Sequence, residues 1–374
     1  MKGIDSRFSA PIVLLLFLFL FSLMVTDSEG REGVRIRDMA GREVFLPKKP
    51  ERIVALSGSL RYVVYLQAVD KLVGIEAVEK QPLMRGIIAT GRPYNIVIRE
   101  KITPLPVIGE GGPGKLPEME RLLMVKPDVV ILYEPDMAEA ITSKTGLPTV
   151  VIKSIATEAW TWEELKEVLR FLGKLLDREK RAEELINYIE KLVKELNNRA
   201  SREIATSYYI GAVSARGAHG TTSTVAKVPP LTLLKAKNIS EEFSPKGGHL
   251  FIDKEALLSR NPDFIFFDTA GLSLVQEDYL KNPHYYQRIK AINAKNVYTL
   301  LPINFYRTNL EFLLANTFFI GKKLRPKEYA DLDPIEKTRE ILKVFLGRDV
   351  LDEVLRDYPA FKRVEFGDKG LLFK

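Results

Sequence analysis

The chain contains no cysteine, only three histidines and only two tryptophans among its 374 residues. The absence of cysteine excludes disulfide bridges, thiolate metal sites and a lipid-modified cysteine anchor. Neither a Gly-x-Ser-x-Gly elbow nor a His-Glu-x-x-His motif is present, so the usual signatures of an exported hydrolase are missing. We therefore expect no enzymatic activity, we assign no metal site, and we expect no cofactor.

A strong excess of one charge is also missing. The 56 Lys and Arg residues against 49 Asp and Glu residues give a net charge of +7, spread along the chain without a polybasic tail. This pattern disfavours a nucleic-acid partner and fits an anionic ligand or a membrane surface. The length and the 46% apolar content fit a soluble protein of two domains.

One long apolar stretch stands at the N-terminus. The uncharged segment 9–26 follows Lys2 and Arg7, as in an export signal. No Ala-x-Ala cleavage pattern precedes Asp27, so an uncleaved membrane anchor remains an alternative. We predict that residues 1–26 are a signal peptide or an N-terminal membrane anchor, that residues 27–33 are a spacer, and that the body is exported to an extracytoplasmic location.

Two stretches of the chain carry nearly the same pattern, residues 120–132 and residues 255–267. In each, an acid opens a short amphipathic helix, a Pro-Asp pair ends it, and a short apolar run follows that is typical of a buried parallel strand. The pattern predicts two similar α/β lobes, residues 34–160 and residues 201–325. Such sheets bind ligands at the carboxyl ends of their strands, so we expect a small ligand between the lobes.

The connection between the lobes, residues 161–200, has apolar residues at three-four spacing. This pattern predicts two helices or one kinked helix that acts as a spine. Each segment holds too few heptads for a coiled-coil dimer, and we expect a monomer. Residues 326–374 are expected to form C-terminal helices that cover the second lobe, followed by a charged tail.

Four segments, residues 38–46, 50–56, 71–75 and 120–132, occur in an order and spacing that resemble the substrate-binding proteins of ABC importers for ferric siderophores and cobalamin. The resemblance covers residues 34–347. It implies a class III periplasmic-binding-protein-like α/β fold, in which two Rossmann-like lobes are bridged by a long helix and close only slightly on binding. The chain departs from the family at Ser57-Gly58-Ser59, where the family usually has Ser-Pro-Ser or Ser-Pro-Ala.

The resemblance implies a receptor that delivers a small molecule, a ferric siderophore or a similar iron complex, to an ABC permease with its ATPase. Cobalamin, haem, or an oxyanion such as molybdate or tungstate remain alternative ligands, and an exported α/β enzyme or a surface scaffold are alternatives of other classes. In the family, one surface glutamate of each lobe pairs with arginines of the permease, and the repeat gives these roles to Glu120 and Glu255. The alternative is simple stabilisation of a helix end by the macrodipole.

The candidate ligand-binding residues follow predicted strands or lie in nearby loops. Arginine offers several fixed donors to carboxylate, catecholate or oxyanion groups, whereas tyrosine and histidine can stack on a ligand or bind a ferric centre. Taken singly, each residue also fits an ordinary solvated loop side chain. The candidates are Ser57, Ser59, Arg61, Arg85, Arg92, Tyr94, Arg216, His219, Thr221, Tyr306 and Arg307.

Overall fold

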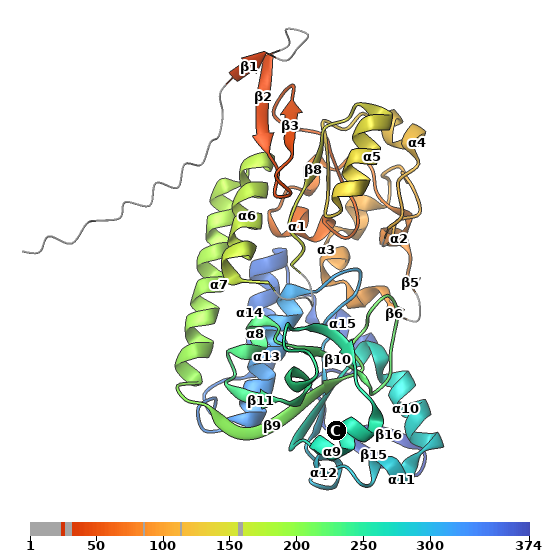
Figure 1. The fold of residues 1–374 in the computed structure, drawn as a ribbon, viewed down its shortest axis with the longest axis vertical. Helices are drawn as coiled ribbons and strands as arrows, with labels where there is room; N and C mark the ends of the chain where they lie inside the picture. The colour runs from red at the N-terminus through yellow and green to blue at the C-terminus, as the bar shows by residue number, and fades with distance from the viewer. Residues whose placement is uncertain (1–23, 27–31, 85–86, 113, 156–159) are drawn as a thin grey trace, which may run out of the picture.

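The computed structural model describes residues 24–26, 32–84, 87–112, 114–155 and 160–374. Two α/β lobes lie one above the other along the long axis of the molecule (Figure 1). Most of the predicted signal peptide or anchor, residues 1–23, lies outside the described residues, as does Arg85. No helix in the described part of the chain is long and apolar enough to cross a membrane.

The first lobe begins with a hairpin of β2 (Glu32–Arg37) and β3 (Glu43–Leu46), on whose edge β1 (Met24–Thr26) adds a third antiparallel strand. Its central sheet is parallel, in the order β4-β7-β8. Alternate strand residues pack on opposite helices, as expected for a sheet that is covered on both faces. The strands are β4 (Ile53–Ala55), β7 (Val129–Leu132) and β8 (Thr149–Val151).

Helices cover this sheet on its two sides. Helices α4 and α5 pack on one face, while α1 and α3 pack on the other. A short hairpin of β5 (Leu83–Met84) and β6 (Ile87–Ile88) lies between α2 and α3 in the chain. The helices of this lobe are α1 (Leu60–Tyr65), α2 (Ala77–Lys80), α3 (Pro93–Ile102), α4 (Met119–Met124) and α5 (Pro135–Thr145).

The second lobe contains a four-stranded parallel sheet in the order β11-β9-β13-β14. A two-stranded antiparallel sheet, β10 with β12, lies beside it. Two similar α/β lobes are therefore present, as predicted from the repeat. The strands are β9 (Ile204–Gly211), β10 (Ser223–Ala226), β11 (Ala236–Asn238), β12 (Gly248–Phe251), β13 (Phe264–Asp268) and β14 (Val297–Leu300). The helices are α8 (Pro229–Thr232), α9 (Lys254–Arg260), α10 (Leu272–Lys281), α11 (Pro283–Tyr286), α12 (Lys290–Asn293) and α13 (Leu310–Leu324).

The repeated Pro-Asp pair has the same structural role in both lobes. Asp128 accepts hydrogen bonds from the backbone N–H groups of Glu51 and Arg52, both at 2.9 Å, just before β4. Asp263 accepts from the backbone N–H of Ser207 at 2.8 Å, within β9. Each carboxylate therefore ties the start of one strand to the neighbouring strand. Partial burial would raise the pKa of Asp128, but these hydrogen bonds and the adjacent lysine hold it below its usual value.

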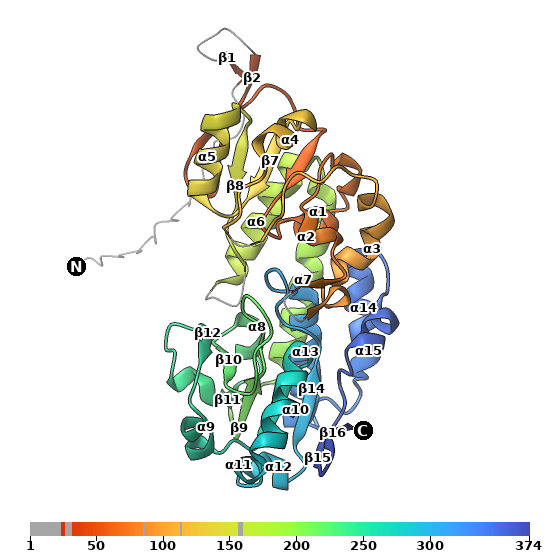
Figure 2. The ribbon, with the colours of Figure 1, turned by 90° about the vertical axis from the view of Figure 1, so that its right-hand side faces the viewer.

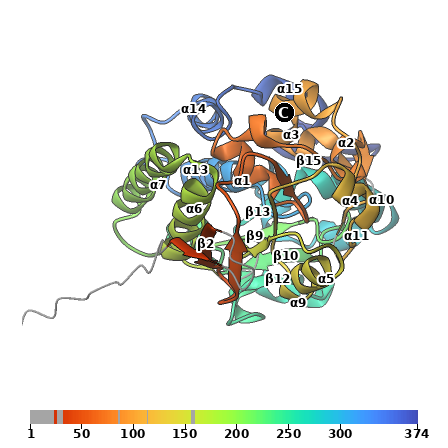
Figure 3. The same cartoon turned by 90° about the horizontal axis from the view of Figure 1, so that it is seen from above.

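The spine consists of two antiparallel helices, α6 (Trp162–Leu176) and α7 (Glu179–Arg199), which lie side by side on one flank (Figure 3). Asp177 reverses the chain in a left-handed conformation, so the alternative of one kinked helix is wrong. The ion pairs Lys166–Glu190 at 3.0 Å and Arg170–Glu183 at 2.6 Å join the two helices. With 21 residues, α7 spans about 31 Å and runs past both lobes (Figure 1).

The C-terminal helices link the two lobes. Helix α14 (Pro334–Leu346) packs on α13 of the second lobe, but it also contacts α1 and α3 of the first lobe and α7. The ring of Phe345 lies 5.2 Å from that of Tyr65 on α1. These helices therefore pack on the second lobe, where we expected them, and they also contact the first lobe; Figure 2 shows α14 and α15 beside both lobes. The chain ends with α15 (Leu351–Asp357) and a hairpin of β15 (Val364–Gly367) and β16 (Gly370–Phe373).

We predict that Asp128→Ala lowers the free energy of unfolding by about 1.5–3 kcal/mol, because two backbone N–H groups lose a charged acceptor. Chemical denaturation of the purified protein measures the change. Glu139→Ala, at an exposed position of α5, is the control and should change stability little. Equal stability of the two variants would contradict the role given to the repeated aspartate.

Candidate functional site

Loops at the carboxyl ends of the parallel strands meet between the lobes. Residues 57–59 follow β4 and residues 133–134 follow β7 in the first lobe. In the second lobe, residues 212–222 follow β9 and residues 301–309 follow β14. Side chains of the last segment contact the first-lobe loops directly, as described below. The predicted position of a ligand site, at the strand ends of both lobes, is therefore where the lobes touch.

The turn of residues 304–309 carries the second lobe's main contribution. A β-bridge between Asn304 and Thr308 closes it. Tyr306 and Arg307, at its tip, have positive φ angles of 51° and 83°, which are uncommon for residues other than glycine. Such conformations persist where surrounding contacts enforce them, often at functional sites. The turn projects both side chains into the first lobe.

The guanidinium of Arg307 lies among polar groups of the first lobe. It donates to a carboxylate oxygen of Glu134, to Ser154 Oγ at 3.2 Å and to the carbonyl of Ser57 at 3.4 Å. It also lies over the ring of Tyr133, 4.6 Å from the centroid. Arg307 therefore already holds one carboxylate, in the planar arrangement that suits an anionic group.

Gly58 explains the departure from the family pattern at this loop. Its φ angle is +83°, and a Cβ added there would lie 2.5 Å from the carbonyl oxygen of Tyr306. A proline or any other residue at this position would therefore collide with the turn of the second lobe. Glycine at position 58 is therefore required by the close approach of the two lobes.

Tyr306 forms a second contact between the lobes, with a buried carboxyl group. Its hydroxyl donates to Glu76 Oε2 at 2.7 Å and accepts from the backbone N–H of Gly112 at 2.9 Å. The same carboxyl oxygen accepts from the backbone N–H of Ser57 at 3.0 Å. Burial raises the pKa of Glu76 to about 8, despite these hydrogen bonds. Glu76 is therefore mostly protonated at neutral pH.

Arg61 supports the turn from within. The side chain is 1% exposed, and its donors bond to the carbonyl oxygens of Gly58, Phe305, Tyr306, Arg307 and Thr308 and to the side chain of Asn309. Every guanidinium nitrogen of Arg61 already donates to the protein. In this conformation Arg61 therefore has a structural role and no nitrogen without a protein acceptor to offer a ligand.

Arg92 and Tyr94 are also completely buried. Arg92 forms a 2.9 Å ion pair with Glu79, and both side chains are 0% exposed. The hydroxyl of Tyr94 donates to the same carboxylate at 3.0 Å. The guanidinium of Arg92 lies over the ring of Phe305, 4.7 Å from the centroid. These two predicted ligand residues form an internal cluster beneath the inter-lobe turn, with no exposed surface in this conformation.

Two further predicted residues have internal partners. Ser59 Oγ donates to the carbonyl of Ile131 at 3.0 Å, in the core of the first lobe. Thr221 Oγ1 lies 2.6 Å from the hydroxyl of Tyr286, and the carbonyl of Thr221 accepts from Tyr209 at 2.8 Å. Both residues are buried and fasten loops to their own lobes.

His219 belongs to an aromatic cluster beside the β10–β12 sheet. Its ring and that of His249 lie 6.3 Å apart, and both meet the exposed ring of Phe251 edge-on at 5.0 Å. Burial, and then the neighbouring His219, lower the pKa of His249 to about 4, so this imidazole is neutral at neutral pH. Arg216 lies in the same loop and is exposed. No group of three or more potential metal-ligating side chains occurs in the described residues.

Among the buried polar atoms that have no hydrogen-bond partner in the described residues, four lie in the strand-end loops of the two lobes. An unsatisfied buried polar group is costly. A polar ligand or water would satisfy them. The atoms are Ser57 Oγ, Glu134 Oε2, Ser214 Oγ and Thr308 Oγ1. We call these four residues together with Arg307 the inter-lobe site.

The structure brings together Ser57 and Arg307 from the predicted set, with Tyr306 beside them. Arg216 and His219 lie in the loop after β9, whose Ser214 carbonyl accepts from Asn304 at 2.7 Å. Sequence reasoning missed Glu76 and Glu134. Glu134 comes directly after the repeated strand, which is the position where a ligand-facing residue is expected.

Comparison with known proteins gives a family and a fold. A family model described as "Periplasmic binding protein" matches residues 53–303. A search of curated proteins finds no match. The crystal structure of Haemophilus influenzae MolA bound to molybdate has 18% identity and a TM-score of 0.66, with coverage of 84% of this chain and 98% of MolA.

Two further crystal structures are similar. Helicobacter pylori CeuE with nickel(II) bound has 18% identity and a TM-score of 0.62, with coverage of 85% of this chain and 98% of CeuE. A protein of the Fe3+-hydroxamate transport system of Saccharomonospora viridis has 19% identity and a TM-score of 0.51, with coverage of 78% and 98%. At these identities the likeness shows the fold.

The raised pKa of Glu76 predicts a dependence of stability on pH. The protonated form is favoured in the folded state, so its contribution to stability is complete below the ordinary glutamate pKa of 4.5 and is lost as pH rises toward the folded-state pKa of about 8. Glu76→Gln mimics the protonated group and cannot ionise. We expect the denaturation midpoint of this variant to rise relative to that of the wild type as pH increases from about 5 to about 9, because only the wild-type carboxyl group ionises. A constant difference across this range would contradict the buried, protonated Glu76.

Proposed function

The chain belongs to the periplasmic binding protein family, and from this premise we propose that it is an extracytoplasmic receptor that delivers an anionic solute to an ABC importer, with a ferric siderophore as the leading ligand. The family match, residues 53–303, includes both parallel sheets and the spine. Proteins of this family bind solutes, which agrees with the expectation that the chain is not an enzyme.

The observation that carries the proposal is the inter-lobe site. Arg307 holds a carboxylate there, and hydroxyl groups from both lobes lie nearby without partners. A ligand with several acidic oxygens can take the place of Glu134 on Arg307 and accept from Ser57, Ser214 and Thr308. Glu134 then acts as an internal competitor, which keeps the guanidinium paired until a stronger anion arrives.

The aromatic cluster of His219, His249 and Phe251 supports an iron complex as the ligand. His249 is neutral at neutral pH, and a neutral imidazole is the form that binds a metal. The exposed ring of Phe251 offers a surface on which a large ligand can stack. Similar structures include a protein of an Fe3+-hydroxamate transport system and one with bound nickel(II).

An oxyanion such as molybdate is the second candidate ligand. The unpartnered hydroxyl groups of Ser57, Ser214 and Thr308, with Arg307, are short-range donors that suit a compact anion without any stacking surface. The similar MolA structure has molybdate bound. A ferric siderophore would use the aromatic cluster of His219, His249 and Phe251, whereas a compact oxyanion would not.

We propose that Glu120 and Glu255 contact the permease. Both are exposed, and each is the second residue of its helix, Glu120 on α4 and Glu255 on α9. These helices lie at equivalent places in the two lobes, far apart along the long axis (Figure 1). Two equivalent acids on two similar lobes suit a permease with two-fold symmetry.

The first prediction from this proposal concerns Arg307. Arg307→Ala should weaken binding about 10-fold to 100-fold, because a charged hydrogen-bonding group is worth about 1.5–3 kcal/mol. Calorimetric titration with ferric enterobactin, whose tris-catecholate iron complex is an anion, and, separately, with molybdate measures the change. Arg288→Ala, at an exposed position of the second lobe, is the control. If Arg307→Ala binds the preferred ligand like the control, the anionic inter-lobe site is disproved.

The second prediction concerns docking. The double charge reversal Glu120→Lys with Glu255→Lys should abolish stimulation of the transporter ATPase, while ligand affinity and melting temperature stay nearly unchanged. A matched control reverses Glu139 and Glu277, which are exposed on α5 and α10. If the first pair still stimulates the ATPase as well as the control pair, Glu120 and Glu255 only stabilise their helices.

A further inference from the structure

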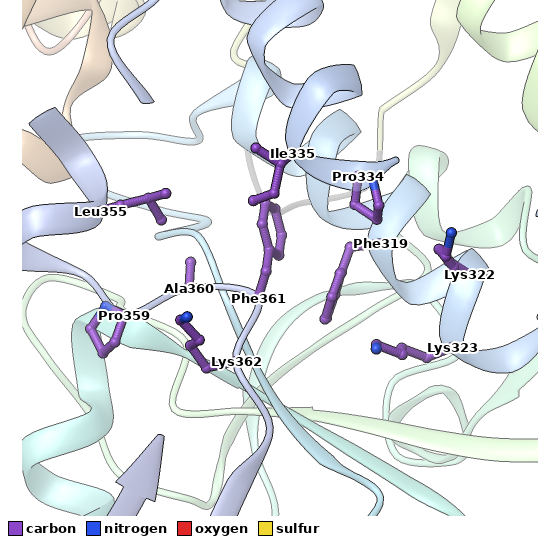
Figure 4. Close-up of a pocket in the computed structure, with 10 residues that line it drawn as sticks. All are labelled: Phe319, Lys322, Lys323, Pro334, Ile335, Leu355, Pro359, Ala360, Phe361 and Lys362. Atoms are coloured by element: carbon purple, nitrogen blue, oxygen red, sulfur yellow. The ribbon is translucent and has the colours of Figure 1, made fainter. Parts of the chain in front are cut away.

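A cavity lies away from the inter-lobe site. It has a volume of about 510 Å³ and opens between α13, the start of α14, the end of α15 and residues 359–362 (Figure 4). This volume lies within the range of about 300–1,000 Å³ that is usual for small-molecule sites. Its main lining residues are Phe319, Lys322, Lys323, Ile335, Leu355 and Phe361.

Helix α13 separates this cavity from the inter-lobe site. The helix begins at Leu310, directly after the inter-lobe turn, and Lys323 lies near its other end. At 1.5 Å per residue, the two ends are about 20 Å apart. A ligand in this cavity therefore does not contact Arg307.

One side of the cavity is apolar. The rings of Phe319 and Phe361 lie 4.6 Å apart, and Ile335 and Leu355 extend this surface (Figure 4). Phe361 has a φ angle of +61°, which is a strained conformation for a bulky residue. Its backbone N–H donates to the carbonyl of Thr299 at 2.9 Å, so the β14 strand enforces this conformation. The ring is held against Phe319 at a cost in backbone energy.

The other side of the cavity is cationic. Lys322, Lys323 and Lys362 all line it, and no aspartate or glutamate is among its described lining residues. The ammonium of Lys323 lies 4.5 Å from the ring centroid of Tyr298. Burial, and then the nearby cations Lys322 and Arg363, lower the pKa of Lys323. The positive charges of Lys322 and Arg363 therefore repel that of Lys323.

Lys337, on the neighbouring helix α14, shows how carboxylates usually compensate the charge of such a lysine. Lys337 also lies over an aromatic ring, that of Phe318, but it pairs with Glu195 at 3.1 Å and Glu340 at 2.9 Å. Those carboxylates compensate its charge within the protein. No aspartate or glutamate is among the described lining residues of the cavity, so an external anion would relieve the repulsion that Lys322 and Arg363 exert on Lys323. The ammonium group of Lys322 itself donates to the carbonyl of Leu332.

We propose that this cavity binds an amphipathic anion, whose acidic group lies beside Lys323 and whose apolar part packs on Phe319 and Phe361. A free organic acid and the anionic end of a membrane lipid share this chemistry. Either source is compatible with an exported protein, and the experiment below distinguishes them.

Calorimetric titration of the full-length protein with octanoate tests the site, and octan-1-ol serves as the uncharged analogue. We expect octanoate to bind 1:1 and at least about 10-fold more tightly than octanol, because the lysines contribute through charge. Lys323→Gln should remove this preference. The same variant should not lower the melting temperature, since it removes a cation from a cluster of cations.

Lys327→Gln is the matched control, at an exposed position just beyond α13. It should bind octanoate like the wild type. Phe361→Ala should weaken octanoate and octanol together, because both need the apolar surface. The proposal is overturned if octanoate does not saturate a single site, or if Lys323→Gln binds it as tightly as Lys327→Gln does.

Co-sedimentation with phosphatidylglycerol vesicles identifies the source of the anion. Vesicle binding that Lys323→Gln reduces several-fold, and that Lys327→Gln does not reduce, supports a lipid. Vesicle binding that is equal in the two variants, together with charge-dependent octanoate binding, supports a free organic acid.

Discussion

The buried guanidinium of Arg61 is the interaction on which the arrangement of the lobes depends. A buried charge is stable only when its donors are satisfied, and Arg61 satisfies most of them with carbonyl oxygens of the second lobe. Pulling the lobes apart would leave this cation unpaired in the first lobe. Together with α7 and α14, which contact both lobes, this constraint favours a receptor that changes its shape only slightly.

The same constraint places the residue that we propose to bind ligand. Because Arg61 fixes the carbonyl groups of the turn, Tyr306 and Arg307 are held in left-handed conformations and their side chains enter the first lobe. Gly58 leaves room for this approach. One arginine thus has a structural role so that another can have a functional role, and the two are close in space although 246 positions separate them.

The sequence predicted what local pattern determines. The repeated Pro-Asp pair indicated two similar lobes, and the three-four spacing of apolar residues indicated the helical spine. The other features of the structure depend on contacts between residues that are distant in the sequence. Arg92 and Tyr94 follow a strand, as binding residues do. In the structure, however, both side chains are buried and bond to the carboxylate of Glu79. The reversal between α6 and α7 depends on Asp177 in a left-handed conformation, which apolar spacing does not reveal.

Satisfaction of charge and hydrogen bonding separates structural residues from candidate functional ones in this protein. Arg61 and Thr221 look functional by residue type, yet their polar groups are paired inside the fold. Ser57 and Ser214 look ordinary, yet their buried hydroxyl groups have no partner among the described residues. In the cavity beside Phe361, Lys323 is likewise unfavourably placed, because it is partly buried and the nearby cations Lys322 and Arg363 repel it. Both sites therefore follow from one principle, because a folded chain retains an unsatisfied buried group at a cost that binding can offset.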